Sequence, residues 1–331
     1  MSPVRPRRRG AGLIAGLALV LVSTRASAQA SPPGARPVPP MQVIPLPDDK
    51  ASIQRDGREL TIYHFGPALR RPFLFPVIGP AGRSLTRMGH PHDPVTHSHH
   101  NSVWVAHHDV NGESFWDDRG PGRIAHRRIV RYDDGEAAGI VALNAWVGAG
   151  GRVHLLERRG LSVRPLADDQ WLMVLDLQFE PERQPVTLGV TPFGMVGVRM
   201  AKTIGVHDGG GRIRNSEGNV NETGPNGAFR KPARWVDYSG PIAPGVAEGL
   251  TLLDHPSNPN HPSAFHVRDD GWMGASLSLE RPITIEPGKP PRLRYGLLVH
   301  RGVPGPDALD RQWQEFAREP IPELPAKGGG G

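Results

Sequence analysis

The chain contains no cysteine among its 331 residues. This absence excludes disulfide bonds, thiolate metal sites and a cysteine nucleophile. The sequence also lacks a G-x-S-x-G elbow, an H-E-x-x-H zinc motif and a glycine-rich phosphate loop, which removes the common serine hydrolases, zinc proteases and nucleotide-binding enzymes. Two chemistries remain, namely acid/base catalysis by histidine and carboxylate side chains, and a metal site built from the same residue types.

The charge balance gives no sign of a nucleic-acid partner. The first thirty residues hold five of the 39 basic residues and no acidic residue, whereas the whole chain has 33 acidic residues. The rest of the chain is therefore nearly neutral, and the basic character of the full sequence comes mostly from its start. A net charge near zero therefore gives no indication of a nucleic-acid partner.

The N-terminal segment has the pattern of a secretory signal peptide. Arginines at positions 5–9 precede an apolar run at 11–22, and small residues near Ala28 or Ala30 offer a cleavage site. A run of twelve residues is too short to span a bilayer of about 30 Å, so we expect no stable membrane span. We therefore expect a signal peptide over 1–30 and a periplasmic or secreted protein.

Strand and turn signals dominate the rest of the chain. A proline-rich leader is expected over 31–50, one domain over 51–320 and a flexible tail over 321–331. Segments 123–132, 140–148, 152–163 and 170–180 are apolar or alternating and are separated by Asp, Gly and Ala turns, which predicts an antiparallel meander. Residues 205–227 are too rich in glycine and asparagine for regular structure.

Helical spacing occurs once, near the C-terminus, where Leu309, Trp313 and Phe316 follow Pro306. The sequence therefore predicts an all-β protein, formed by a single large antiparallel β-sandwich with long rim loops and one C-terminal helix.

Histidine is concentrated in one stretch. Seven of the fifteen histidines lie between positions 90 and 108, and imidazole is both the side chain that titrates near neutral pH and the commonest metal ligand. If 102–110 is a strand, His107 and Asp109 share a face, so that the aspartate could orient the imidazole. His90 and His92 are interpreted as a surface segment that precedes the site. His99 and His100 are expected to belong to the site itself.

A second group of candidate site residues lies in the segment DHPSNPNHPSAFHVRDDG. Prolines stiffen the loop that carries Asp254 and His255, which lowers the entropic cost of holding them in place. His266 and Arg268 alternate on a short strand and can point into one pocket. Two further segments offer an amide, a carboxylate and an aromatic ring for binding a sugar, through Asn215, Glu217 and Trp235.

These motifs together resemble the bacterial PmoA-like family, which is in substance a domain of unknown function. The resemblance rests on RPFLFPVIGP, HSHHNSVWVAHHDVNG, RIRNSEG, ARWVDYSGP, DHPSNPNHP and FHVRDDG, in this order. It implies a sandwich similar to the galactose mutarotases and a role in exported systems that handle saccharides. The oxygenase activity in the family's name is rejected, because a membrane methane monooxygenase subunit needs several apolar spans.

The sequence departs from the resembled family at one point. The family carries a Lys-Glu-Gly followed by a phenylalanine and an arginine where this chain reads TPFGMVGVRM (191–200). Arg199 is kept, whereas Thr191, Pro192 and Phe193 offer neither a base nor a cation. If the family's glutamate is catalytic, this protein must use another residue, such as Glu217, or lack the activity.

Three functions remain open. The first is an exported carbohydrate-active hydrolase, lyase or epimerase, with a saccharide or another small molecule as substrate and no cofactor. Its catalytic groups would be His107, Asp109, His255, Asp254 and Glu217. Its binding groups would be His99, His100, Arg199, Asn215, His266, Arg268 and Trp235. The second is a hydrolase or oxygenase that depends on a divalent metal bound by His97, His99 and His107. The third is a saccharide-binding protein without catalysis.

Overall fold

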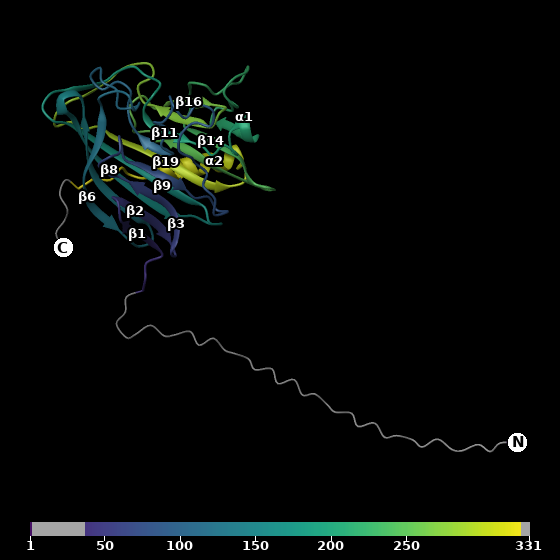
Figure 1. Ribbon diagram of the computed structural model, residues 1–331. Coiled ribbons are helices and arrows are strands. Elements are labelled where there is room, and N and C mark those ends of the chain that lie inside the picture. Colours follow the sequence, from purple (N-terminus) through teal and green to yellow (C-terminus); the bar gives the residue numbers. More distant parts are fainter. Residues whose placement is uncertain (2–36, 326–331) are drawn as a thin grey trace. The chain divides into compact units, whose positions relative to one another are not determined.

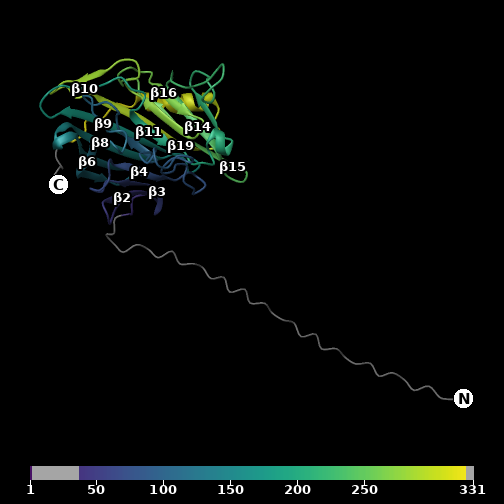
Figure 2. The same cartoon turned by 45° about the horizontal axis from the view of Figure 1, so that its top comes forward.

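The computed structural model describes residue 1 and residues 37–325, and the predicted signal peptide lies almost wholly outside these residues. From Pro39 the chain forms one compact unit. Its strands make two large antiparallel sheets that pack face to face, with β1 and β2 lying against β7. Figures 1 and 2 show β2 and β3 of one sheet alongside β8 and β9 of the other. The predicted all-β sandwich is confirmed.

The larger sheet has nine strands. In spatial order they are β1 (Met41–Leu46), β2 (Lys50–Arg55), β3 (Arg58–His64), β4 (Phe73–Val77), β5 (Val103–Val105), β11 (Met195–Arg199), β17 (Trp272–Ser276), β16 (Ala264–Arg268) and β13 (Lys231–Pro232).

The second sheet has eight strands. In spatial order they are β12 (Arg212–Asn215), β14 (Trp235–Ala243), β15 (Val246–Asp254), β19 (Arg292–Arg301), β9 (Trp171–Pro181), β8 (Val153–Pro165), β7 (Ala138–Val147) and β6 (Arg123–Asp133). The consecutive order β6 to β9 is the predicted meander. A separate pair is formed by β10 (Val186–Leu188) and β18 (Ile283–Ile285).

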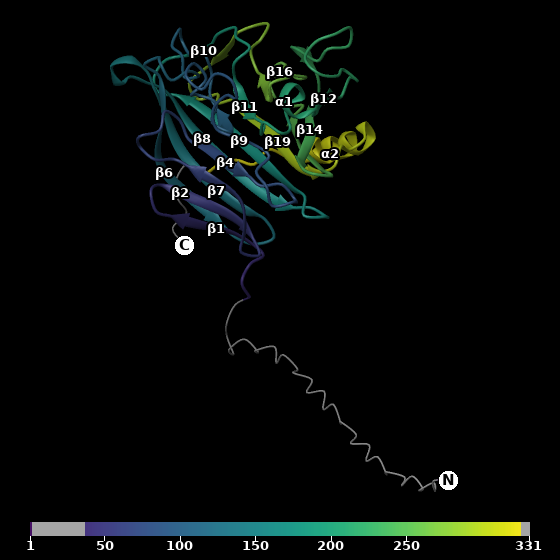
Figure 3. The same ribbon diagram turned by 45° about the vertical axis from the view of Figure 1, so that its right-hand side comes forward.

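Within residues 37–325 the helices are few and short. They are a 3₁₀ turn η1 (Ala149–Gly151), α1 (Val206–Gly209) and α2 (Pro306–Arg318). Helix α2 is the predicted C-terminal helix, and Figures 1 and 3 show it beside β14 and β19.

Strand β9 shows how the core is built. Its residues Trp171, Met173, Leu175, Leu177 and Phe179 share one parity and belong to the main core between the sheets. The opposite parity is also apolar at Leu172 and Val174, and these side chains pack with α2. Both faces of this strand are therefore buried, one under a sheet and one under a helix.

Four predictions about the extent of the elements differ from the structure. The sheet begins at Met41, because the segment before Ala51 already alternates and pairs with β2. The C-terminal segment is not free at position 324, where Leu324 is buried against β8. The stretch 205–227 holds α1 and β12. The strand expected over 102–110 ends at Val105, so the alternation of His107 and Asp109 does not follow from strand geometry.

Candidate functional site

The site is built on one row of the nine-stranded sheet. Trp104 on β5, Gly197 on β11, Gly274 on β17 and His266 on β16 are register neighbours across four strands. Side chains of one row point to the same face of a sheet. A tryptophan and a histidine therefore stand on either side of two positions that have no side chain.

The two glycines make room for Trp272. A Cβ atom at Gly197 would lie 2.7 Å from Trp272 Cη2 and 2.9 Å from Trp104. A Cβ atom at Gly274 would lie 2.7 Å from Trp272 Cζ2. Real Cβ atoms essentially never approach other atoms this closely, so the indole can occupy the space above these two positions only because both are glycine.

The other face of the same strands is apolar. Val103, Val196, Val198, Met273 and Val267 have the opposite parity and are buried in the main core. The strands are therefore two-sided, with the core beneath them and the polar and aromatic site residues above.

Two loops cover this upper face, and one buried arginine joins them. Arg71, which is 1% exposed, donates through Nη1 to Asn101 Oδ1 at 2.8 Å. Its Nη2 donates to the carbonyl of Trp116 at 2.8 Å and to Asp118 Oδ1 at 2.9 Å. The loop that carries the histidines is thus fixed to the loop that carries Trp116.

Between the loops and the sheet lies a cavity of about 540 Å³. Such a volume is typical of a small-molecule site. Six histidines line it: His90, His97, His99, His100, His108 and His266. Trp116, Phe193 and Trp272 supply aromatic surface, and Asp117, Arg119, Arg199, Arg268 and Asp270 supply charge.

His100 is held in an aromatic stack. Its ring centroid lies 5.5 Å from that of Trp104 and 5.4 Å from that of Trp272, with both pairs close to parallel. Burial and then the neighbouring His99 lower the pKa of His100 well below its usual range. His100 is therefore neutral at pH 7.

His266 is enclosed by aromatic rings. Its centroid lies 5.3 Å from Phe193, 5.0 Å from Phe229 and 6.2 Å from Trp272. Neither ring nitrogen makes a hydrogen bond of normal geometry within residues 37–325, although the nearby Pro192 carbonyl favours the protonated form. Burial, followed by Arg230 and Arg268, lowers the pKa of His266 to about 4. This leaves a neutral imidazole beside the cavity, whose buried nitrogens have no partner of normal geometry among the described residues.

A second imidazole is oriented by a carboxylate. His97 Nδ1 lies 3.0 Å from Asp93 Oδ2. Since a carboxylate only accepts hydrogen bonds, Nδ1 carries the proton and Nε2 is left as an acceptor. The ring centroids of His90 and His100 lie 4.6 Å and 4.9 Å from that of His97.

Three side chains joined by hydrogen bonds close one side of the cavity. Arg199 donates to Asp270 Oδ1 at 2.9 Å, and His90 Nε2 donates to Asp270 Oδ2 at 2.8 Å. Burial acts to raise the pKa of Asp270, but Arg199 and His90 outweigh it and the pKa is lowered. Asp270 is thus ionised, and both of its partners are held in place.

The structure brings together five of the predicted binding residues. His99, His100, Arg199, His266 and Arg268 all line the one cavity. Burial and then Arg71 lower the pKa of His99 to about 4.

The predicted pair of His107 and Asp109 lies outside the cavity lining. The Asp109 backbone N–H, and not its carboxylate, donates to His107 Nδ1 at 3.1 Å. His107 Nε2 then donates to Ser278 Oγ at 2.9 Å, and the ring is fully buried. The expected orientation of the imidazole by the aspartate carboxylate is therefore wrong, because the strand ends before these residues.

Asp254 and His255 lie elsewhere, next to α2. Asp254 accepts from Asn258 at 2.7 Å, from His261 at 2.7 Å and from the Ser263 backbone at 2.8 Å, which organises the proline-containing loop. His255 packs edge-on against Phe316 with centroids 5.4 Å apart. Neither residue lines the histidine cavity.

Three further candidates are also outside the cavity lining. Asn215 is buried and its Oδ1 accepts from the backbone of Glu217 at 3.0 Å and of Asn219 at 2.9 Å, as a turn residue does. Glu217 is exposed and accepts from Ser216 Oγ at 2.8 Å. Trp235 is fully buried and its indole donates to Asp310 on α2 at 2.8 Å.

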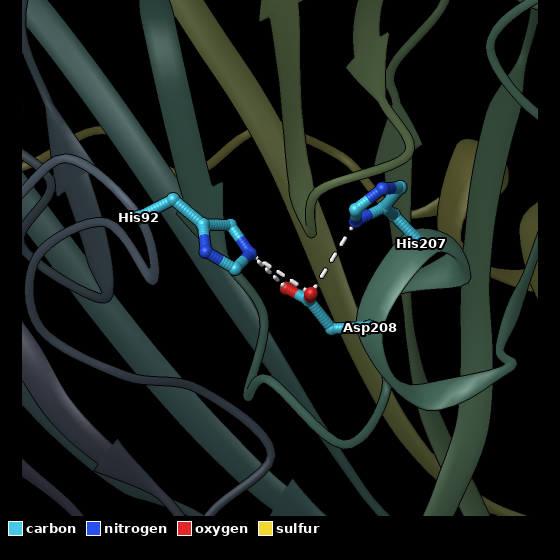
Figure 4. A group of neighbouring side chains, drawn as sticks. All are labelled: His92, His207 and Asp208. Atoms are coloured by element: carbon cyan, nitrogen blue, oxygen red, sulfur yellow. Dashed lines mark hydrogen bonds and ion pairs between the residues drawn. The ribbon is translucent and has the colours of Figure 1, made fainter.

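The predicted metal set is not brought together, because His107 faces Ser278 while His97 and His99 line the cavity. A different group could hold a metal ion. Among the described residues, His92, His207 and Asp208 place one nitrogen or oxygen atom each within 4.8 Å of one another. Figure 4 shows both imidazoles directed toward the carboxylate.

Comparison with known proteins identifies a family. Residues 50–314 match a family of unknown function, DUF6807. The chain belongs to this family. The match spans most of the chain and confirms a domain of unknown function, but it does not connect the chain to the PmoA-like group in particular. No curated sequence matches this member of DUF6807. Within the described residues, no helix is both long and apolar enough to cross a membrane.

Several site residues were not predicted from the sequence. Trp272 continues the parity of His266 and Arg268 across a hairpin, so the strand pattern could have found it. Arg71, Trp116 and Arg119 carry no such signal, because they reach the cavity through loop contacts between segments distant in sequence.

Proposed function

We propose that this protein is an exported carbohydrate-active enzyme, which binds a sugar or glycoside in the histidine cavity and acts on it by acid/base chemistry. The observation that carries the proposal is the combination, in one cavity, of aromatic surface with several imidazoles, one of which is oriented by a carboxylate. Aromatic faces pack on the apolar side of a sugar ring, and imidazoles bind and deprotonate its hydroxyl or ring positions.

The aromatic platform is formed by Trp116 and Trp272. Their rings lie 5.6 Å apart and nearly perpendicular, and Phe193 lies 5.6 Å from Trp116. The two indole planes stand at nearly a right angle, so a sugar ring could pack on the face of either one. A sugar ring packed there would present its hydroxyl edge to the histidines.

His97 is the proposed proton acceptor. Asp93 fixes its tautomer and leaves Nε2 free of the carboxylate, which is the arrangement that a general base requires. His266 is the proposed second group, since its buried nitrogens have no competing partner of normal geometry within the described residues. One imidazole removes a proton while the other donates a hydrogen bond, a division of roles that suits hydrolysis, elimination or epimerisation.

Arg119 extends the proposal to acidic sugars. Its side chain is exposed at the cavity and has no hydrogen-bond or ion-pair partner in the part of the chain that the structure describes. Arg268, in contrast, already pairs with Glu222 at 2.7 Å. A carboxylate on the substrate could form an ion pair with the Arg119 guanidinium.

The test is a panel of neutral and acidic oligosaccharides, assayed for binding by calorimetry and for turnover by product analysis. His97→Ala should lower kcat by about 10²–10⁴-fold, which is typical of a lost general base, and Trp116→Ala should weaken binding. His255→Gln is the matched control, because this histidine lies next to α2, and its turnover should stay near wild type. Equal losses in His97→Ala and His255→Gln would contradict the assignment.

Binding without turnover would favour the other function that the cavity permits, a saccharide-binding protein. This function is supported by the absence, before Phe193, of the Lys-Glu pair that the resembled family carries, since a catalytic glutamate would be lost with it. Failure of every saccharide to bind would remove both.

A further inference from the structure

We propose that His92, His207 and Asp208 form a binding site for one divalent transition-metal ion of the zinc type. The site lies outside the lining of the histidine cavity and does not depend on the saccharide function. It comes from two separate parts of the chain. His92 belongs to the histidine loop before β5, whereas His207 and Asp208 lie on α1 (Figure 4).

The distances between the donor atoms suit a tetrahedral ion. With metal–ligand bonds of about 2.0–2.1 Å, two ligands of a tetrahedral zinc ion lie about 3.3 Å apart. His207 Nδ1 lies 3.3 Å from Asp208 Oδ1. His92 Nε2 lies 2.8 Å and 2.9 Å from the two carboxylate oxygens, so this pair needs to open by about half an ångström to admit an ion.

The donor types and the charge also fit. Two imidazoles and one carboxylate are ligands that zinc and its neighbours in the first transition row accept, and magnesium or calcium would prefer oxygen donors. With neutral imidazoles the set carries one negative charge. Lys202 acts on the Asp208 carboxylate electrostatically but forms no ion pair with it among the described residues.

The exposure of the ligands leaves a coordination position open. The side chains of His92 and His207 are 49% and 72% exposed, while that of Asp208 is 9% exposed. The carboxylate thus forms the buried base of the site, and the imidazoles form its outer edge. Water can occupy the fourth position of an ion bound there.

A metal ion at this site would tie the histidine loop to α1. His92 lies two residues from His90, which contacts Asp270 at the cavity. The backbone N–H of His92 donates to His90 Nδ1 at 3.0 Å. Fixing His92 therefore also fixes the loop that forms the cavity rim, and binding should stabilise the fold.

The experiment uses the full chain without an affinity tag, stripped of metal by a chelator and titrated with zinc chloride by calorimetry. One ion should bind per chain, and zinc should raise the melting temperature. His92→Ala, His207→Ala and Asp208→Asn should each weaken binding by more than about 100-fold, which exceeds the 10–100-fold loss for outer-shell partners.

Two control variants make the result specific. His126→Ala removes a histidine on β6 whose ring bonds Asn144, and His97→Ala removes a cavity histidine. Both should bind one zinc ion with unchanged affinity. Absence of zinc binding would overturn the proposal, as would affinity that falls in His97→Ala but not in the three site variants. Melting curves of the metal-free variants show that each is folded.

Discussion

At the scale of single residues, Arg71 has the most partners at the site. It is buried, and its hydrogen bonds to carbonyl and carboxylate oxygens join the histidine loop to the loop of Trp116. Burial would lower its pKa, and Asp118 partly offsets this. A planar guanidinium with five N–H groups can satisfy several acceptors in fixed directions, which an ammonium group cannot.

Arg71→Met should therefore lower the free energy of unfolding by about 3–5 kcal/mol, since it removes the donor to Asp118, to the Asn101 side chain and to the Trp116 carbonyl. Arg71→Lys should lose less stability but still weaken ligand binding, because one ammonium cannot reach both loops. Urea unfolding and calorimetry measure the two effects. A lysine variant with wild-type binding would show that Arg71 only stabilises the fold.

At the scale of elements, one glycine on β11 and one on β17 decide where Trp272 lies in the cavity wall. Gly197 and Gly274 lie between Trp104 and His266 in one row, and Trp272 occupies the space that their missing Cβ atoms leave. A sheet that carried side chains at these two positions would hold the indole away from its surface.

Gly274→Ala should displace Trp272 and weaken ligand binding at least about tenfold, which corresponds to about 1.4 kcal/mol. The new methyl group would also lie 3.1 Å from the Val196 carbonyl, so some loss of stability is expected. Gly66→Ala is the matched control, since its nearest contact would be at 3.9 Å. Fluorescence of the tryptophans should change in the first variant and not in the second.

The helix α2 stabilises the second sheet from outside. Phe316 is fully buried against Leu172, Val174 and Leu253, and Trp313 donates to the Asp254 carbonyl at 2.8 Å. Phe316→Ala should lower the free energy of unfolding by about 3–5 kcal/mol. Glu315→Ala, an exposed change on the same helix, should leave it nearly unchanged, and saccharide binding should survive in both. Chemical denaturation followed by circular dichroism measures the difference.

At the scale of the whole molecule, buried neutral histidines set the response to acid. Burial is the main cause that lowers the pKa of His99, His107 and His266 to about 4, against 6.5 in an unfolded chain. Between these values the unfolded state binds more protons than the folded state. The stabilising contribution is therefore complete above about pH 6.5 and is lost as the pH falls toward 4.

The free energy of unfolding should accordingly fall between pH 7 and pH 5, by about 1–2 kcal/mol for each of these histidines. His107→Asn removes one of them at a position away from the cavity lining and should make the decline shallower by up to about 1.4 kcal/mol per pH unit. Urea unfolding at several pH values gives the slopes of the wild type and of His107→Asn, and equal slopes would contradict the linkage.

The Asp270 carboxylate acts in a lower pH window. Arg199 and His90 lower the pKa of Asp270 below 3.8 despite its burial, so its contribution is present above about pH 4 and is lost only below it. A decline that begins between pH 6 and 7 therefore comes from histidines and not from Asp270.

The sequence by itself determined the fold class, the C-terminal helix and most strands. Alternation along 171–179 and helical spacing at Leu309, Trp313 and Phe316 are local patterns, and burial of an apolar face follows from them directly. Part of the site was local in the same sense, because His266 and Arg268 alternate on one strand and point to one face. Clustering in sequence also placed His99 and His100 at the cavity.

Only the tertiary structure decided which histidines work together. His107 and His255 occur in sequence motifs as rich as those of His97 and His266, yet one ring is bonded to Ser278 and the other packs on α2. That choice depends on where β5 ends, on the register of four strands and on loops joined through Arg71. The pairing of His92 with α1 is of the same kind, since its partners lie more than a hundred residues away and no local pattern encodes the contact.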